Sequence, residues 1–294
     1  MMTAGEASDD LTEFSFLEAD ADRLGVSVRD VERVDLGAGL SGLRWLTGPP
    51  LLALAHGAGL HAHSWDSVAL SLGAPSLSID LPGHGQSAWR DDARYSPLEI
   101  APTLTDALRE WPTVSTLVGH SLGGLALIPA AAALSDAVTR LVLVDVTPGF
   151  AKRERNTDAI NAFISGPESY ASRDEVIDRA LAHGIGRRRE DLIRGIFLNT
   201  RVRPDGRVEF RHHLSRLDAS AHRGYDPETL WAPLDDAPKK VLLIRATAGV
   251  LDDEHVAEFR EHRPDATVVE LRGSHNLYRD DPRGVAEAIA RFIG

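Results

Sequence analysis

Short, continuous apolar runs alternate with helical segments along most of the chain, and this alternation limits the possible folds more than any other feature. Runs rich in Val, Ile and Leu are typical of strands that are buried on both faces of a parallel sheet. Such runs occur at 51–55, 75–79, 114–118, 140–144, 240–245 and 267–271. Helical patterns fill several of the intervals, at 98–111, 122–134, 253–261 and 283–293. The alternation predicts a mostly parallel α/β sheet.

Two parts of the chain depart from this pattern. Residues 1–24 form an acidic arm, for which we expect a solvated, partly disordered tail that docks loosely at best. Residues 148–238 contain helical and turn signals but no buried-strand run; they include a capping box at 172–175 and a turn at 204–206. We expect this segment to be an insertion that lies on the sheet. The core is then predicted to comprise 25–147, which begins with a hairpin, and 239–294.

Composition excludes several classes of protein. The 294 residues carry a net charge of −12 and include no cysteine, which rules out disulfides, thiolate metal sites and a cysteine nucleophile. The acidic balance argues against nucleic acid or an anionic membrane as the main partner. The longest apolar run, 125–134, is shorter than the roughly 20 residues that span a bilayer. Since no signal peptide is visible at the N-terminus either, we expect a cytoplasmic protein with a small-molecule substrate.

A Gly-x-Ser-x-Gly motif runs from Gly119 to Gly123, between the apolar run at 114–118 and a helix rich in Ala and Leu. A serine on a sharp strand-to-helix turn has a strained backbone, and the flanking small residues let the chain fold tightly. The turn exposes the hydroxyl above the sheet, beside the amides of a helix N-terminus. This context favours Ser121 as a nucleophile over an ordinary glycine-rich turn.

The segment His56-Gly57-Ala58-Gly59 follows another apolar run. An acyl-transfer site needs two backbone N–H groups directed at the developing oxyanion. Glycines allow this loop to approach the serine, so we predict that the amides of Ala58 and Leu122 form the oxyanion hole. Gly57 and His120, which adjoin these residues, are candidates for the substrate pocket.

His275 lies just after the last apolar run, where a general base on a loop could reach the serine. Eleven other histidines are present, and none follows the last core strand. Two pairs, His61 with His63 and His212 with His213, lack a carboxylate at helical spacing that would complete a ligand set. We therefore predict His275 as the general base and no metal site.

Together these motifs resemble the α/β-hydrolase superfamily, in its esterase-like branch with a helical cap and a serine nucleophile. The segments that carry the resemblance are 56–59, 80–87 (DLPGHGQS), 119–124 and 274–275. The resemblance implies an eight-stranded, mostly parallel sheet flanked by helices, with a helical cap (lid) inserted between strands six and seven. It also implies a Ser–acid–His triad and no cofactor. A serine at the elbow, where dehalogenases and epoxide hydrolases have aspartate, points away from both of those reactions.

The triad acid departs from the family pattern. Most members place it a few residues after strand seven, where this sequence has Gly249. Asp145 ends the run at 140–144 and is the acid that we favour, because a triad requires a geometry rather than a chain position. Asp252 is the alternative, although its position also suits a helix N-cap. Asp253 and a dyad without an acid rank behind both.

The expected reaction is hydrolysis of a carboxylic ester, thioester or lactone through an acyl-enzyme. Aromatic residues of the cap, Phe150 and Trp231 among them, offer an apolar ceiling, which predicts a small hydrophobic substrate. Their alternative role is core packing of the lid. Two other functions stay open: hydrolytic C–C bond cleavage of the diketone type, and a ligand receptor that keeps a hydrolase pocket. Nothing in the sequence indicates the oligomeric state.

Overall fold

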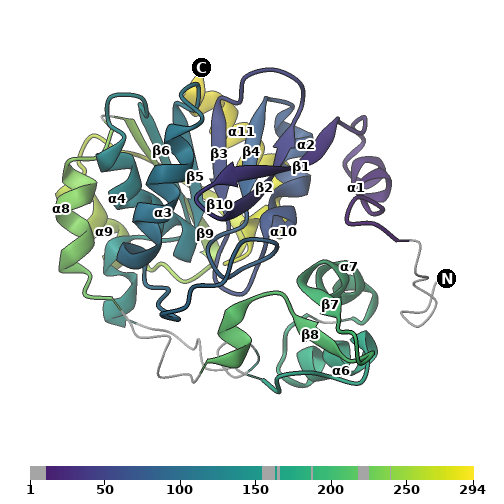
Figure 1. Cartoon of the computed structure of the whole chain (residues 1–294). Helices are drawn as coiled ribbons and strands as arrows, with labels where there is room; N and C mark the ends of the chain where they lie inside the picture. The colour runs from purple at the N-terminus through teal and green to yellow at the C-terminus, as the bar shows by residue number, and fades with distance from the viewer. Residues whose placement is uncertain (1–10, 154–162, 164–165, 187, 218–224, 239) are drawn as a thin grey trace.

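The computed structural model describes residues 11–153, 163, 166–186, 188–217, 225–238 and 240–294. Its central strands are β1 (Val31–Gly37), β2 (Leu40–Trp45), β3 (Leu52–Ala55), β4 (Ser76–Ile79), β5 (Thr116–His120), β6 (Arg140–Val144), β9 (Lys240–Ala248) and β10 (Thr267–Ser274). They form one eight-stranded sheet in the order β1-β2-β4-β3-β5-β6-β9-β10 (Figure 1). β1 pairs with β2, and β2 with β4, in antiparallel register, whereas the five other pairs are parallel. The prediction of an eight-stranded, mostly parallel sheet is confirmed.

Helices cover both faces of the sheet. One layer contains α3 (Pro97–Arg109), α4 (Leu122–Ala133), α8 (Glu228–Asp235) and α9 (Asp253–His262), and the other contains α2 (Asp66–Leu72), α10 (Leu277–Asp280) and α11 (Pro282–Ile293). In β6, Leu141 and Leu143 pack into the first layer, and Val142 and Val144 into the second. A strand with two buried faces needs an apolar residue at every position, which explains the continuous apolar runs. Among the described residues, no helix combines the length and apolar character that a membrane-spanning segment needs.

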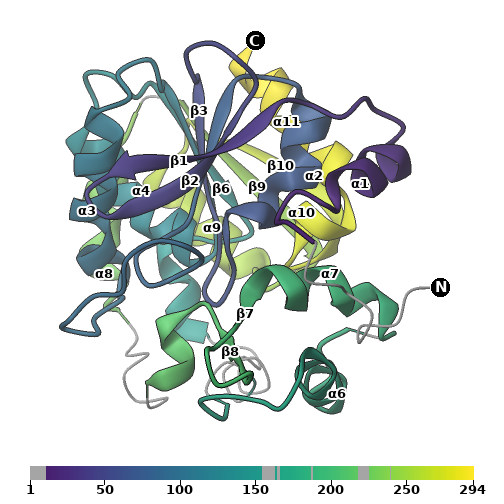
Figure 2. The ribbon, with the colours of Figure 1, turned by 45° about the vertical axis from the view of Figure 1, so that its right-hand side comes forward.

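Residues 148–238, called the insertion below, separate β6 from β9. The described part contains η3 (Pro148–Arg153), α6 (Arg173–Ala182), α7 (Glu190–Asn199), β7 (Thr200–Val202), β8 (Val208–Phe210), η4 (His213–Arg216) and α8. In both ribbon views the part that carries α6, α7, β7 and β8 lies beneath the sheet, whereas α8 lies beside α4 (Figure 2). One half of the predicted capping box is present: the Ser172 hydroxyl accepts a hydrogen bond of 3.2 Å from the Glu175 amide at the start of α6, whereas the Glu175 carboxylate accepts from the Ala171 amide instead of that of Ser172. The last helix, α8, packs against α4 of the core.

The expectation of helices and turns alone in the insertion is wrong, because β7 and β8 form an antiparallel hairpin. Each of these strands has three residues, which is too short for a period-2 pattern to be visible in the sequence. The turn at 204–206, which the sequence does predict, joins them.

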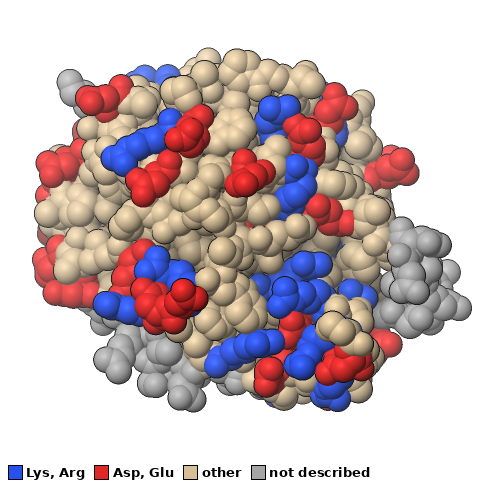
Figure 3. Space-filling view, in the orientation of Figure 1, with Lys and Arg blue, Asp and Glu red and all other residues tan. Residues whose placement is uncertain are grey.

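Charged residues of the insertion pair largely with each other. Arg and Lys side chains gather over it at the lower right of Figure 3, with acidic side chains between them. Arg189, for example, lies 2.9 Å from Asp174 and 2.7 Å from Asp178. Exposed pairs of this kind contribute little stability, and their main effect here is to neutralise the arginines locally.

The acidic arm continues into α1 (Leu17–Leu24), which docks on the core. Leu17, Ala21 and Leu24 are buried in one apolar cluster with Leu43 and Trp45 of β2. Their spacing of four and three residues places them on one face of the helix. The expectation of a loosely docked tail is therefore wrong for α1, whose narrow apolar face is easily overlooked in an acidic segment. Residues 1–10, to which the same expectation applied, lie outside the described residues.

Glu13 makes an ionic contact between the arm and the core. Its Oε2 accepts hydrogen bonds from Arg33 and from His63, the latter at 3.0 Å, and His63 Nδ1 lies 2.9 Å from Asp66 Oδ2. Burial alone would lower the pKa of His63, but the charge and hydrogen bond of Asp66, together with Glu13, raise the pKa to about 9. Burial alone would raise the pKa of Glu13, but hydrogen bonds from His63 and Arg33 lower it to about 2.

Replacing Glu13 by Gln should destabilise the fold in a pH-dependent way, by about 1–3 kcal/mol at its largest. The raised pKa of His63 means that its contribution is complete below pH 6.5 and is lost as the pH rises through about 9. The lowered pKa of Glu13 means that its contribution is complete above pH 4.5 and is lost as the pH falls through about 2. The difference between wild type and Glu13→Gln should therefore be largest between pH 4.5 and 6.5 and should shrink toward pH 9.

Urea unfolding of both proteins across this pH range measures the difference. Glu18→Gln is the matched control, since it removes the same charge from an exposed position of α1. An equal loss of stability in the two variants, or a loss for Glu13→Gln that does not change with pH, would contradict the ionic contact described here.

Candidate active site

Ser121 lies on the sharp turn between β5 and α4. Its backbone angles, φ 51° and ψ −124°, fall in a region that residues with a side chain rarely adopt. The turn depends on two glycines: a Cβ at Gly119 would lie closer than 3.0 Å to the backbone of Gly124, and one at Gly123 would lie closer than 3.0 Å to the carbonyl of His56. The strand–turn–helix arrangement predicted from the motif is present.

The segment His56–Gly59 follows β3 and lies against this turn. The Gly123 amide donates a hydrogen bond of 3.0 Å to the His56 carbonyl, and a Cβ at Gly57 would lie 3.2 Å from Ser121 Cβ. Within the described residues, neither the Ala58 amide nor the Leu122 amide donates a hydrogen bond to the protein. Both predicted oxyanion donors thus belong to segments that contact each other, and both N–H groups are unpaired in this part of the chain.

His275 and Asp145 are in direct contact. His275 follows β10, and its Nδ1 lies 2.8 Å from Oδ2 of Asp145, which directly follows β6. Asp145 is wholly buried, has a φ of 50°, and accepts hydrogen bonds of 3.0 Å from the amides of Ala246 and Val250. The two amides hold the carboxylate, and the carboxylate in turn orients the imidazole.

Gly249 occupies the position where the family pattern led us to expect an acid. A Cβ at Gly249 would lie closer than 3.0 Å to both carboxylate oxygens of Asp145. The space that a side chain at residue 249 would fill is therefore taken by the carboxylate of Asp145, which reaches His275 from the neighbouring strand.

Asp252, the alternative acid, caps α9 instead. Its Oδ1 accepts hydrogen bonds from the amides of Glu254 and His255, at 3.1 and 3.0 Å, and lies 2.7 Å from the His255 ring. An N-cap side chain makes such contacts, because the first backbone N–H groups of a helix have no acceptor within the helix. The structure therefore brings Asp145, and not Asp252, to His275.

His120 joins the turn at Ser121 to the loop that carries His275. Its Nε2 donates a hydrogen bond of 2.8 Å to the His275 carbonyl, and the two ring centroids are 4.4 Å apart. Burial, and then the proximity of His275, hold the pKa of His120 well below its ordinary value, so the ring is neutral. His120 is 1% exposed, so it offers almost no surface to a substrate in this structure, and its role in the pocket stays a prediction. Within the described residues, no hydrogen bond links the Ser121 hydroxyl to His275.

The two aromatic residues predicted for the pocket differ in exposure. Phe150, in η3, is half-buried and packs into the same apolar cluster as Leu122. Trp231 is 2% exposed and stacks on His262 of α9, with ring centroids 4.0 Å apart. Trp231 therefore packs between α8 and α9, within the apolar cluster that Phe150 and Leu122 also join, and its burial fits the core-packing alternative.

Contacts to Gly59 were not anticipated in the sequence. The Gly59 amide donates to His84 Nε2 at 3.0 Å, and the Gly59 carbonyl accepts from the Asn199 side chain at 2.6 Å. Asn199 belongs to α7, far along the chain and outside any motif, so no local signal could have identified it. In the described residues, no group of three or more His, Asp or Glu side chains is placed to hold a metal ion.

Three comparisons relate the chain to known proteins. Residues 52–288 match the model of the alpha/beta hydrolase family. The chain is 37% identical to esterase Rv0045c of Mycobacterium tuberculosis over 96% of its own length and 97% of the relative. The crystal structure of that esterase has a TM-score of 0.86 to this structure and is 34% identical over 97% of this chain and 99% of that one. The mouse sn-1-specific diacylglycerol lipase ABHD11 is 24% identical over 83% of this chain and 81% of the lipase.

The sheet order, the strained serine turn and these matches agree with one another. The chain belongs to the alpha/beta hydrolase family.

Proposed function

We propose that this hydrolase is a serine esterase that cleaves small hydrophobic carboxylic esters through an acyl-enzyme on Ser121. The observation that carries the proposal is the contact between His275 and the buried carboxylate of Asp145, next to a serine in strained backbone. The similarity to a protein named as an esterase, over nearly the whole chain, supports the same activity.

In the proposed mechanism His275 Nε2 takes the proton of Ser121 as the hydroxyl oxygen attacks the ester carbonyl carbon. The new O–C bond forms while the carbonyl π electrons move onto its oxygen. The amides of Ala58 and Leu122 stabilise this oxyanion, and the loss of one such donor costs about 3–4 kcal/mol of barrier stabilisation. His275 then gives its proton to the departing alkoxide, and the acyl-enzyme remains.

Water completes the cycle by the same steps. His275 removes a proton from the water as it attacks the acyl-enzyme, and the tetrahedral intermediate collapses to the free acid and the Ser121 hydroxyl. Asp145 keeps Nδ1 of His275 protonated and stabilises the imidazolium that forms in both halves of the reaction.

We propose that the insertion is the cap over this site and that its apolar residues, with Phe150 at the start, favour a hydrophobic acyl group. Thioesters and lactones present the same electrophilic carbonyl and belong among the substrates to assay. Several relatives of this chain are named as esterases or lipases. This favours ester hydrolysis over the C–C bond cleavage and the ligand receptor that the sequence leaves open.

Ser121→Ala tests the nucleophile. We expect wild type to hydrolyse p-nitrophenyl esters and to be labelled by a fluorophosphonate probe. The variant should lose the label, and kcat should fall by roughly 10⁴–10⁶-fold, because the hydroxyl that forms the acyl-enzyme is removed. Ser135→Ala, at an exposed position after α4, is the control and should retain both properties. Persistent labelling of Ser121→Ala would assign the reaction to another residue.

Asp145→Asn tests the acid. The amide cannot hold His275 in the required tautomer, so we expect kcat to fall by roughly 10⁴-fold while the fold is kept. Asp252→Asn is the matched control, because asparagine is also a good N-cap and should leave both activity and stability nearly unchanged. Steady-state kinetics of the two variants decide between the acids, and the reverse ranking would assign the role to Asp252.

Gly249→Ala tests the space that Asp145 occupies. The new methyl group should displace the carboxylate from His275 and lower kcat by about 100-fold or more, with little change in KM. Gly195→Ala is the control: nothing lies within 4 Å of its Cβ position on the exposed face of α7, so we expect normal activity and a gain of about 0.5–1 kcal/mol in stability. Equal kcat values for the two variants would show that residue 249 has no bearing on the acid.

A further inference from the structure

The loop from Gly57 to Leu60 is held through two of its peptide groups, Gly57–Ala58 and Gly59–Leu60. The Leu60 amide donates a hydrogen bond of 3.3 Å to the Gly57 carbonyl, which closes the turn, and His56 Nδ1 lies 2.8 Å from the same carbonyl. His56 Nε2 accepts from the Leu81 amide, so Nδ1 carries the proton and donates to Gly57. The carbonyl of the Gly57–Ala58 peptide is thus fixed by two donors.

A fixed carbonyl also fixes the direction of the Ala58 amide. The peptide group is planar and trans, so the Ala58 N–H points opposite to the Gly57 carbonyl. Any movement of the Leu60 amide, which holds that carbonyl, therefore tilts the Ala58 N–H as well.

Asn199 holds the peptide that contains the Leu60 amide. Its Nδ2 donates a hydrogen bond of 2.6 Å to the Gly59 carbonyl, and this carbonyl and the Leu60 N–H belong to one planar unit. A chain of hydrogen bonds runs from Asn199 through the Gly59–Leu60 peptide to the Gly57–Ala58 peptide. Hydrogen bonds in such a chain polarise one another, which strengthens the last donor.

We infer that Asn199, which belongs to the insertion, is a positioning residue that aligns the Ala58 amide in the core. The position of the insertion on the core thereby affects the geometry of the oxyanion hole. The inference rests on the proposed function, since it takes Ala58 as an oxyanion donor.

Helix α7 is anchored firmly enough to serve in this role. Arg194, on the same helix, lies 2.6 Å from Asp66 of α2 and 2.8 Å from Asp20 of α1. Phe197 packs edge-on against Phe16, with ring centroids 5.3 Å apart. In both ribbon views α7 lies between α6 and α1 (Figures 1 and 2). Asn199 therefore reaches Gly59 from a helix that the core and the arm both hold.

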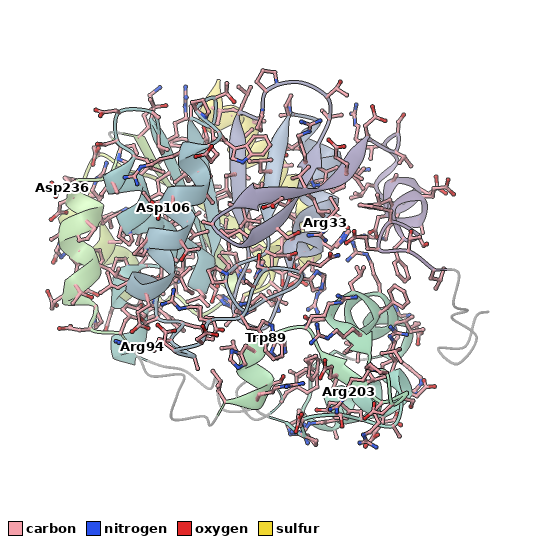
Figure 4. All side chains as sticks on the ribbon, in the orientation of Figure 1. Arg33, Trp89, Arg94, Asp106, Arg203 and Asp236 are labelled. Carbon is pink, nitrogen blue, oxygen red and sulfur yellow. The ribbon has the colours of Figure 1, made fainter. Side chains whose placement is uncertain are left out.

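The insertion has a second, separate attachment, at Trp89 (Figure 4). The Trp89 ring stacks on His213 with centroids 4.5 Å apart, and the His213 amide donates to the Gly83 carbonyl at 2.7 Å. Loss of the Asn199 hydrogen bond alone should leave these contacts and the ion pairs of Arg194 in place. The effect of that loss should therefore be on the chemical step rather than on folding.

Two substitutions of Asn199 test the inference. Asn199→Asp keeps the shape but directs a carboxylate oxygen at the Gly59 carbonyl, and Asn199→Leu keeps a similar size without a donor. We expect kcat to fall by about 10- to 100-fold in both, with KM changed by less than about threefold. Phenylboronic acid, whose adduct with a serine is tetrahedral, should bind more weakly by a factor similar to the fall in kcat/KM. A residue that only seats the insertion would change KM or thermal stability and leave kcat and boronate binding intact.

Arg203→Gln is the matched control in the insertion. Its ion pairs, with Glu168 and Asp205, stay within the insertion, so we expect wild-type kinetics. Unfolding temperatures check that each variant folds. If Asn199→Leu does not fold, Asn199→Asp alone tests the inference. The inference would be overturned if kcat of the Asn199 variants stayed within twofold of wild type, or if only KM changed. The proposed function would still hold in that case, provided that wild type shows Ser121-dependent hydrolysis. Absence of that hydrolysis in wild type would instead refute the proposed function.

Discussion

The buried carboxylate of Asp145 is the group on which the rest of the site depends. A wholly buried charge is unfavourable unless hydrogen bonds satisfy it, and here two backbone amides and the His275 ring do so. Asp145 and Ser121 both have a φ near 50°, a conformation that costs on the order of 1–3 kcal/mol per residue. They follow β6 and β5, which pair in parallel, so both strained residues lie side by side at the carboxyl ends of adjacent strands. The packed sheet holds them there.

Strand pairing also explains how the acid can follow β6 instead of β9, after which the family pattern places it. β9 is the other neighbour of β6, so side chains that follow β6 and β9 approach the same space from two sides. Only one carboxylate fits, because a Cβ at Gly249 would overlap Asp145. Asp145 after β6 therefore requires a residue without a side chain at position 249 after β9, and glycine meets that requirement.

A network of charged side chains extends from the arm to the insertion and to the loop that follows β4. Its members are Glu13, Asp20, Arg33, His63, Asp66, Asp80 and Arg194. Asp80 in turn accepts a hydrogen bond of 2.6 Å from the Ala62 amide, just after the loop that contains Ala58. Residues 11–24 of the acidic arm are therefore part of the folded hydrolase and hold α7, from which Asn199 contacts Gly59.

Local features of this protein could be read from the sequence, because periodicity and glycine spacing act through the nearest neighbours in the chain. The apolar runs identified the strands of the sheet, and the motif around Ser121 identified the strained turn. The sequence favoured Asp145 as the partner of His275 and kept Asp252 as the alternative. The contact itself, between residues 130 positions apart, is visible only in the tertiary structure. For the same reason only the tertiary structure shows the docking of α1, the stacking of Trp231 on His262 and the contact of Asn199 with Gly59. Each depends on which distant residues share a space, and no local pattern encodes that.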